Sequence, residues 1–433
     1  MSHQPLSPVP GRRRFYAADR SGIRRRLLSA LVSVVVLGGA VVGAVALSGG
    51  GSPSRMPDDG IGAPASVPGS VASASVGVRG RDLRFGLSFG DTLTWTTDAK
   101  LAKAMDDAEE LGVRWLRVDL SWRTIQPDSP DQYLWERFDR VVDAARAHGL
   151  DVLPTISYTP RWAADPNCGS TSQTCPPADD GRFAEFARRA AERYAPKGVH
   201  TWEIWNEPNI KPFWRTGPDA GRYATLLAAT APAIRSADPH AYLLLGGLAA
   251  VDTVPSRQYV SHQTFLAELG RLGALKQVDA ISYHPYTFPL LPSTRTATGT
   301  RFEEIDRTKD SLVAILARYG ERGMPVWLTE TGAPTWAPGK AADTPSAPDT
   351  THATPRLQAE IAQDTVTAAA AIPSVDVVFW FSYQDVAPET ATSRKSQHYG
   401  LTYYDGRRKP AFDALEQAIR AYQEKKGEKG KQG

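Results

Sequence analysis

The chain has 433 residues, 42% of them hydrophobic, so it can bury a large core in one domain or in two or three smaller ones. Its formal net charge is only +3, and the basic residues do not gather on one recognisable helix, which argues against nucleic-acid binding. Eleven tryptophans and fifteen tyrosines supply flat rings that suit a buried core or a stacking surface.

The N-terminal region reads as a membrane anchor. Residues 1–26 form a basic segment with seven arginines and one acid, and residues 27–47 then carry no charged side chain. That apolar run is long enough to cross a bilayer as a helix. Because the arginines stay in the cytoplasm, the pattern predicts a single-pass transmembrane signal anchor that leaves the rest of the chain outside the cell. The alternative is a secreted protein cleaved after Ala46, since Ala44-Val45-Ala46 is an Ala-x-Ala site.

Two segments of biased composition bound the folded part. Residues 48–80 are rich in Gly, Ser, Pro and Ala, which predicts a flexible, exposed linker. Residues 423–433 are polar, lysine-bearing and interrupted by glycine, which predicts a disordered tail. One folded domain, residues 81–422, is expected between them.

Within this domain, strand-like and helix-like patterns alternate eight times. Strands are predicted at residues 83–89, 114–120, 151–157, 201–206, 242–246, 279–283, 326–330 and 375–381. Several of the helical patterns end at a glycine, as Leu111-Gly112 and His148-Gly149 do. Eight such units predict an α/β fold with a parallel sheet closed into a single (β/α)8 TIM barrel. An open doubly wound sheet is the alternative, although no Gly-x-Gly-x-x-Gly follows the first strand.

The only two cysteines, Cys168 and Cys175, lie in one loop-like run. In an exported protein this short spacing predicts a local disulfide, and free thiols are the alternative. Two cysteines without nearby histidines make a poor zinc site, and no paired-histidine motif points to another metal.

Two of the predicted strands end in a glutamate. The fourth reads Thr-Trp-Glu-Ile-Trp-Asn-Glu-Pro over residues 201–208, and it must stop at Pro208 because proline donates no ladder hydrogen bond. Asn206 and Glu207 therefore lie at a strand end beside aromatic rings, where desolvation raises the pKa of a carboxyl towards the range of a general acid. The seventh strand ends at Glu330. Two such glutamates, far apart in sequence, are what glycoside hydrolysis requires.

Other polar and aromatic residues also follow apolar strands, and in a (β/α)8 barrel these strand ends form the active-site face. The further candidates at this face are Arg117, Trp162, His284, Tyr286 and Trp380. Arg117 has a second interpretation, in which it neutralises Asp119. Glu203 is expected to pair with a cation in the barrel rather than to react.

Trp-Asn-Glu-Pro at the fourth strand, His-Pro-Tyr at the sixth and the glutamate at the seventh resemble the clan A glycoside hydrolases. The resemblance is nearest to family 39, with the cellulase-like enzymes of family 5 next, and it covers about residues 83–422. It implies that Glu207 is the acid/base and Glu330 the nucleophile of a retaining enzyme. It also implies that Asn206 binds the sugar 2-hydroxyl and that Trp380 forms the floor of the sugar subsite.

The same resemblance implies that His284 and Tyr286 shape the site around Glu330 and that Arg117 orients this nucleophile. The third strand departs from the cellulase-like pattern, because Ser157-Tyr158 stands where that branch has a His-Asn pair. Cellulase specificity is therefore not carried over.

The sequence thus predicts a monomeric glycosidase that acts on an extracellular polysaccharide or oligosaccharide without a metal or other cofactor. Its partners are expected to be a carbohydrate substrate and the membrane, not nucleic acid. A non-catalytic carbohydrate-binding barrel that tethers a glycan at the cell surface is the alternative from another class.

Overall fold

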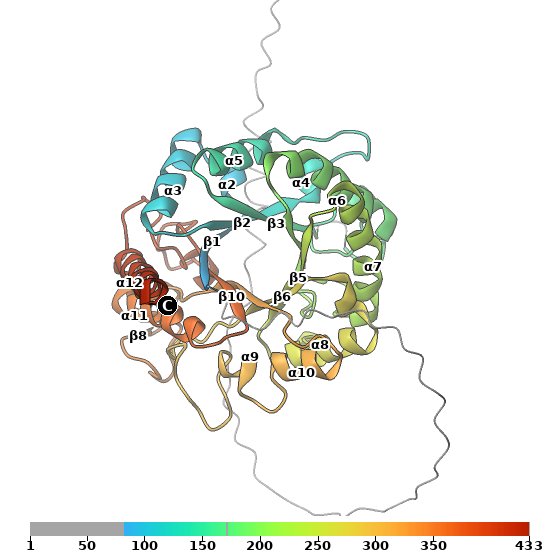
Figure 1. The fold of residues 1–433 in the computed structure, drawn as a ribbon. Helices are drawn as coiled ribbons and strands as arrows, with labels where there is room; N and C mark the ends of the chain where they lie inside the picture. The colour runs from blue at the N-terminus through green and yellow to red at the C-terminus, as the bar shows by residue number, and fades with distance from the viewer. Residues whose placement is uncertain (1–81, 170–171, 433) are drawn as a thin grey trace, which may run out of the picture. The chain divides into compact units, whose positions relative to one another are not determined.

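The computed structural model describes residues 82–169 and 172–432, and eight of its strands close into a parallel barrel (Figure 1). The strands neighbour one another in the order β1-β10-β7-β6-β5-β4-β3-β2, so the chain passes once around the barrel. This topology confirms the predicted (β/α)8 fold. The barrel strands are β1 (Arg84–Gly90), β2 (Trp115–Ser121), β3 (Asp151–Ser157), β4 (Thr201–Asn206), β5 (Tyr242–Ala249), β6 (Ala280–His284), β7 (Val326–Thr331) and β10 (Val375–Phe381).

The helices lie around the outside of the barrel (Figure 1). Several begin at a hydroxyl or carboxylate cap: Thr97 accepts a hydrogen bond from a first-turn backbone N–H, and Asp219 and Thr354 do the same. The main helices are α3 (Asp98–Glu110), α5 (Glu136–Ala147), α6 (Asp180–Tyr194), α7 (Ala220–Ala237), α8 (His262–Arg271), α10 (Leu312–Arg318), α11 (Pro355–Ala370) and α12 (Pro410–Gln432). Three short ones are α2 (Thr92–Trp95), α4 (Trp122–Ile125) and α9 (Glu303–Asp306).

Two apolar layers hold these elements together. The larger fills the space between the strands and the surrounding helices, where residues such as Leu87, Ile204 and Trp380 are buried. The smaller is a plug inside the barrel, in which Trp115 meets Trp327 edge to face with ring centroids 5.2 Å apart. Strand residues that point inward and outward alternate, so each strand serves both layers.

The C-terminal end differs from the sequence prediction. Helix α12 runs to Gln432, whereas a disordered tail was predicted from residue 423. Residues 423–426 are good helix formers that continue the pattern of α12, and Lys426 pairs with Asp82 next to β1. The helix continues through Gly427 and Gly430, although each glycine costs backbone entropy there.

A disulfide joins Cys168 and Cys175. A two-stranded sheet of β8 (Ala341–Ala342) and β9 (His352–Ala353) lies in the long connection after β7. In the part of the chain that the structure describes, no helix combines the length and the apolar character needed to cross a membrane. The predicted anchor at residues 27–47 and the linker at 48–80 lie outside the described residues.

Candidate active site

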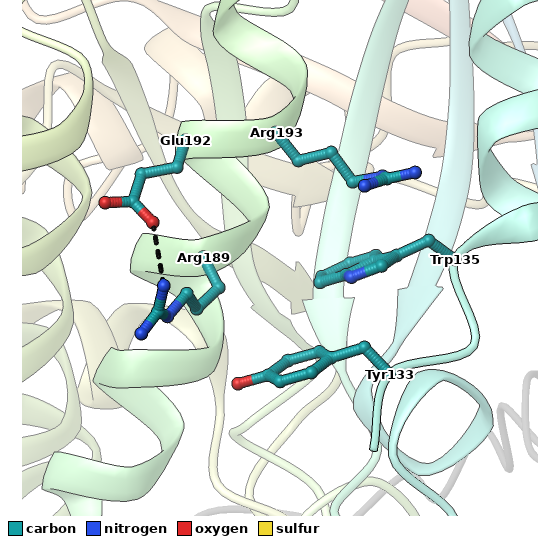
Figure 2. A pocket seen from close by; sticks show the side chains of 5 residues that line it. All are labelled: Tyr133, Trp135, Arg189, Glu192 and Arg193. Atoms are coloured by element: carbon teal, nitrogen blue, oxygen red, sulfur yellow. Dashed lines mark ion pairs between the residues drawn. The ribbon is translucent and has the colours of Figure 1, made fainter. Parts of the chain in front are cut away.

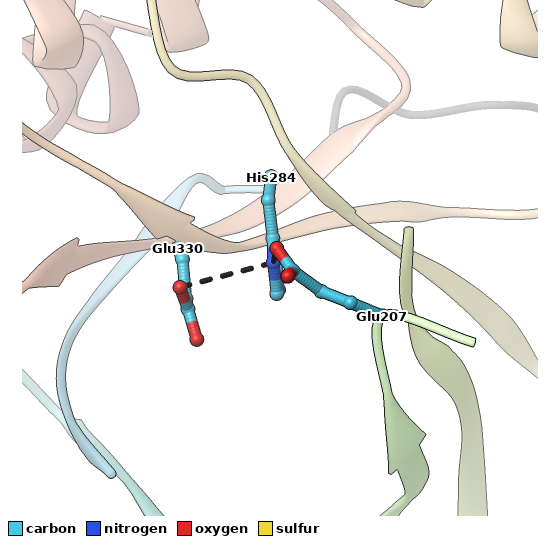
Figure 3. A group of neighbouring side chains, drawn as sticks. All are labelled: Glu207, His284 and Glu330. Carbon is cyan, nitrogen blue, oxygen red and sulfur yellow. Dashed lines mark hydrogen bonds and ion pairs between the residues drawn. The ribbon is translucent and has the colours of Figure 1, made fainter. Parts of the chain in front are cut away.

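The two strand-end glutamates face each other at the C-terminal mouth of the barrel. One carboxylate oxygen of Glu207, one of Glu330 and a ring nitrogen of His284 all lie within 4.8 Å of one another. Figure 3 shows these three side chains converging from separate strands. The barrel therefore brings together residues that are 123 positions apart in the chain (207 and 330).

An unusual backbone turns Glu207 into this space. Trp205 has φ 73° and Glu207 has φ 45°, left-handed values that cost an ordinary residue about 1–3 kcal/mol. The turn at Trp205 sends its indole into the outer core, where the ring nitrogen donates to the Phe213 carbonyl (2.8 Å). The Glu207 N–H then donates to the Gly247 carbonyl (2.8 Å). Strand β4 is thus bent at the point where its glutamate enters the site.

Gly247 is needed at this position because His284 occupies the space beside it. A Cβ on Gly247 would lie 2.1 Å from His284 Nε2, and one on Gly246 would lie 2.5 Å from the Ile204 carbonyl oxygen. Neither contact is possible for real atoms. The Gly246-Gly247 pair of β5 is therefore part of the site. Two adjacent glycines at the end of a predicted strand are the sequence signal that could have indicated this close approach.

A chain of hydrogen bonds fixes the tautomer of His284. The Thr329 hydroxyl donates to Glu203 Oε1 (3.0 Å), so its oxygen accepts from His284 Nε2 (3.0 Å). Nε2 then carries a proton, and in a neutral imidazole Nδ1 is an acceptor. Glu207 Oε1 lies 2.9 Å from Nδ1 and must supply the proton of that bond. The network therefore favours a protonated Glu207 beside a neutral His284.

The electrostatics of the pair agree with this assignment. Burial raises the pKa of Glu207, although the hydrogen bond to His284 opposes the rise. Burial also lowers the pKa of His284, against the effect of Glu207. Both shifts disfavour the charged forms, so the proton stays on the carboxyl.

Arg117 is the cation at the centre of the site. Its Nη1 donates to Glu330 Oε1 (2.7 Å), its Nε to Glu203 Oε2 (2.6 Å) and its Nη2 to Asn206 Oδ1 (2.8 Å). The expected pairing of Glu203 with a barrel cation is confirmed. Arg117 does not hydrogen-bond Asp119. It orients Glu330 and Asn206 together, because its planar fork fixes the direction of each bond.

Glu330 accepts a second hydrogen bond, from the Tyr286 hydroxyl to Oε2 (2.8 Å). Burial raises the pKa of Glu330, and the bonds from Arg117 and Tyr286 oppose this rise by favouring the ionised form. The ring of Tyr286 packs edge-on against Tyr399, and Tyr399 in turn packs against Phe381. The sequence had not identified Tyr399 or Phe381 as parts of this wall.

Two acids at the ends of β1 and β2 were also missed as site residues. Asp119 is 6% exposed and lies two residues after Arg117, so it points to the same inner face of β2. Burial raises its pKa to about 8, and the neighbouring Asp91 adds to the rise. Burial likewise raises the pKa of Asp91 to about 6. Among the described residues, no side-chain hydrogen bond involves Asp119, so its carboxyl is available to a ligand.

One predicted site residue, Trp380, is not brought to the glutamates. Trp380 is in register with Leu87, and both side chains are buried in the outer core between barrel and helices. Phe381, in register with Ser88, faces inward instead. Trp162, in the loop after β3, packs edge-on against Trp122 and donates to the Gln126 carbonyl (2.9 Å). Its half-buried ring stays a predicted sugar contact.

Ser88 lies in Gly86-Leu87-Ser88-Phe89-Gly90, which has the Gly-x-Ser-x-Gly spacing of a serine-hydrolase nucleophile. Here the serine is inside strand β1, and its Oγ accepts from Arg117 (3.1 Å). A nucleophile of that class lies on an exposed turn and hydrogen-bonds a histidine base. Ser88 is buried within a strand, and among the described residues no histidine hydrogen-bonds it.

A separate cavity of about 290 Å³ lies on the outer surface, between the loop before α5 and helix α6. Figure 2 shows the rings of Tyr133 and Trp135 stacked beneath Arg193, with Arg189 and Glu192 on the opposite wall. No residue of this cavity belongs to the glutamate site.

A parallel barrel with glutamates at the ends of β4 and β7 defines the class of the clan A glycoside hydrolases. A sequence model of the Cellulase family (glycosyl hydrolase family 5) matches residues 75–359, which is more than half of the chain, so the chain belongs to that family. This membership confirms the resemblance to clan A inferred from the strand-end residues.

A curated relative named Beta-xylosidase, from Caldicellulosiruptor saccharolyticus, is 26% identical over 324 residues, covering 70% of this chain. The chain spans only 59% of the length of that relative. A family 39 glycoside hydrolase from the gut symbiont Bacteroides cellulosilyticus WH2 aligns with a TM-score of 0.59 at 21% identity, over 79% of this chain and 64% of its own. GH5_18 from Streptomyces cattleya, in complex with GlcNAc, aligns with a TM-score of 0.57 at 20% identity, over 79% of this chain and 81% of its own. These two likenesses show a shared fold.

Proposed function

We propose that the protein is a retaining glycosidase that cleaves an O-glycosidic bond by double displacement. The observation that carries the proposal is the short gap between the two glutamates, whose nearest oxygens lie within 4.8 Å with His284 beside them. Retaining enzymes hold their carboxyl groups about 5–5.5 Å apart, whereas inverting enzymes need about 6.5–9.5 Å to admit a water between them. The bound of 4.8 Å on the nearest oxygens favours the shorter separation of the retaining enzymes.

The reaction needs the two glutamates in opposite protonation states, and the different contacts of each carboxyl support this assignment. Glu330 accepts from a guanidinium and a phenol, which stabilise the negative charge of a nucleophile. Glu207 is held as an acid by its burial and by the tautomer of His284. In the first step Glu330 attacks the anomeric carbon while Glu207 protonates the leaving oxygen. In the second step Glu207 removes a proton from the water that releases the sugar.

The substrate proposed is an oligosaccharide or polysaccharide with a β-glycosidic bond, in line with the name of the Beta-xylosidase relative. Asn206 is positioned by Arg117 to bind the 2-hydroxyl of the sugar beside Glu330. Asp119 hydrogen-bonds a further sugar hydroxyl, since its buried carboxyl has no side-chain partner in the described part of the chain. With its pKa raised to about 8, this carboxyl is protonated near neutral pH and can donate as well as accept. We also propose that residues 27–47 anchor the enzyme with its barrel outside the cell, where such glycans are found.

The proposal is tested by following the first product by NMR on aryl β-glycosides and on a panel of glycans. A retained anomeric configuration is expected. The substitution Glu207→Ala should slow the hydrolysis of substrates with poor leaving groups most, because good leaving groups need little protonation. Added azide should partly restore turnover by this variant, and the product should be a glycosyl azide of retained configuration. An inverted first product would reject the retaining scheme, and glycan binding without turnover over the whole panel would favour the non-catalytic barrel.

A further inference from the structure

A second group of potential metal ligands lies away from the two glutamates, in the connection between β10 and α12. One carboxylate oxygen of Asp385, one of Glu389 and a ring nitrogen of His398 lie within 4.8 Å of one another. Asp385 and His398 are buried, and Glu389 is exposed at the rim. The group therefore reaches the solvent through Glu389.

His398 is the residue that most needs a partner. It is fully buried, and neither of its ring nitrogens has a hydrogen-bond partner. Asp385 Oδ2 is also buried without a partner. An imidazole left unsatisfied in this way costs about 1–3 kcal/mol, so a ligand that binds both groups would recover that energy.

The spacing of these two atoms suits a metal ion better than a hydrogen bond. His398 Nδ1 lies 3.5 Å from Asp385 Oδ2, which is long for an N–H···O bond. Two ligands at about 2.1 Å from a tetrahedral zinc ion are separated by about 3.4 Å. The observed pair is thus already set at the spacing of two metal ligands, and the exposed Glu389 is free to rotate in as a third.

Hydrogen bonds from neighbouring residues hold Asp385 in place, as they commonly do for a carboxylate that binds a metal ion. Its other oxygen, Oδ1, accepts from the Lys409 ammonium (2.8 Å) and from the Gly400 backbone N–H (2.9 Å). Lys409 also donates to Thr335 Oγ1 (2.8 Å). These bonds fix the carboxylate with Oδ2 turned towards His398, and ligating carboxylates are commonly hydrogen-bonded in this way.

We propose that Asp385, Glu389 and His398 form a binding site for a divalent transition metal, with zinc as the ion that fits best. One imidazole and two carboxylates suit zinc, whereas calcium prefers six to eight oxygen ligands and no nitrogen. With three protein ligands, a water completes the tetrahedron.

Occupation of this site would stiffen one wall of the glutamate site. The His398 carbonyl accepts from the Thr335 N–H (2.8 Å), which joins the connection after β10 to the connection after β7. The next residue, Tyr399, packs against Tyr286, the donor to Glu330. The metal would therefore act as a clip that keeps Tyr399 in place, without contacting the substrate.

The test is zinc binding by the full chain in detergent, after EDTA treatment and dialysis. We expect one zinc per chain by elemental analysis and a higher melting temperature with zinc than with calcium. An anomalous difference peak between Asp385 and His398, in crystals grown with zinc, would locate the ion. Zinc found only between Glu207, His284 and Glu330 would overturn the proposal, so titrations are repeated with Glu207→Gln, which should keep the site at His398.

Glu389→Gln is the variant of choice, because this residue is exposed and its loss leaves the fold intact. Zinc affinity should fall at least about tenfold, and the melting temperature without zinc should stay unchanged. Glu424→Gln, the same substitution at an exposed position of α12, is the matched control and should bind zinc like the parent. Equal zinc affinity of the Glu389→Gln chain and the parent, or absence of bound zinc from both, would reject the site.

Discussion

The inside of the barrel contains two regions that the same strands build in different ways. The plug near the N-terminal ends of the strands is apolar, with Trp115 of β2 against Trp327 of β7. Two residues further along each strand, Arg117 and Thr329 belong to a buried polar network. Both regions are closed to solvent, yet one is held by packing and the other by hydrogen bonds and charge.

The difference shows where the fold gives up stability for chemistry. The plug gains free energy from burying aromatic surface, at roughly 25 cal/mol per Å². The polar network buries Arg117 and Glu203, which are at most 1% exposed, and must offset a desolvation penalty of several kcal/mol per ion. Such a network does not improve on an apolar core as a source of stability. The proposed mechanism accounts for its position at the mouth, because that mechanism needs Glu207 and Glu330 in different protonation states.

The largest effect is expected from Glu330→Gln, which removes the proposed nucleophile without changing the shape of the side chain. Turnover of every substrate should fall on the order of 10⁴-fold or more. Steady-state kinetics on aryl glycosides measures the loss, and circular dichroism confirms the fold. Substantial residual turnover with a retained product would mean that another group attacks the sugar.

A second change compares the two regions directly. Arg117→Met leaves Glu203 buried and unpaired, which should cost about 3–5 kcal/mol of unfolding free energy as well as most of the activity. Leu244→Ala in the plug is the matched control. It should cost about 2–5 kcal/mol through the cavity that it leaves, while kcat/KM of the folded enzyme stays the same. Chemical denaturation and kinetics on both variants make the comparison.

The double variant Arg117→Met/Glu203→Gln sharpens this prediction. Removing the charge of Glu203 as well should restore part of the lost stability, because only Glu330, which is nearer the solvent than Glu203, is then left without its cation. Activity should stay low, since Glu330 and Asn206 still lack the guanidinium that orients them. Recovery of activity together with stability would show that Arg117 has only a structural role.

The sequence predicted those parts of the site that depend on single strands. Glu207 and Glu330 were found because apolar runs stop at them, and Pro208 fixes the end of β4. The side that a residue faces was harder to predict where neighbours are equally apolar. Trp380 and Phe381 are both aromatic, and only the register with Leu87 and Ser88 shows that the phenylalanine points inward.

Other features depend on what a second strand supplies. The left-handed backbone at Trp205 is possible because β5 offers Gly246 beside it, while Gly247 leaves room for His284. No local pattern in β4 encodes these partners. The role of Asp119 likewise emerged only when Arg117 proved to be engaged by Glu203 and Glu330. Such residues follow from packing between strands, which periodicity alone does not determine.

The smallest effect, and the most specific, is expected from Tyr286→Phe. This change removes one hydrogen bond to the carboxylate of Glu330, a bond of the kind worth about 1.5–3 kcal/mol. Since the phenol favours the ionised form, its loss should raise the pKa of Glu330 further. A nucleophile acts only above its pKa, so the acidic limb of the pH profile of kcat/KM should move to higher pH. The basic limb, which reports the loss of the Glu207 proton, should stay in place.

Tyr399→Phe is the matched control for this shift, because Tyr399 packs on Tyr286 but donates no hydrogen bond to Glu330 among the described contacts. Its acidic limb should coincide with that of the parent. A uniform fall in kcat/KM at all pH values in Tyr286→Phe would assign the phenol to packing alone. A shift of the acidic limb confined to Tyr286→Phe would place Tyr286 beside Arg117 as a group that keeps the nucleophile ionised, and so would separate the charge network at the mouth from the aromatic packing that surrounds it.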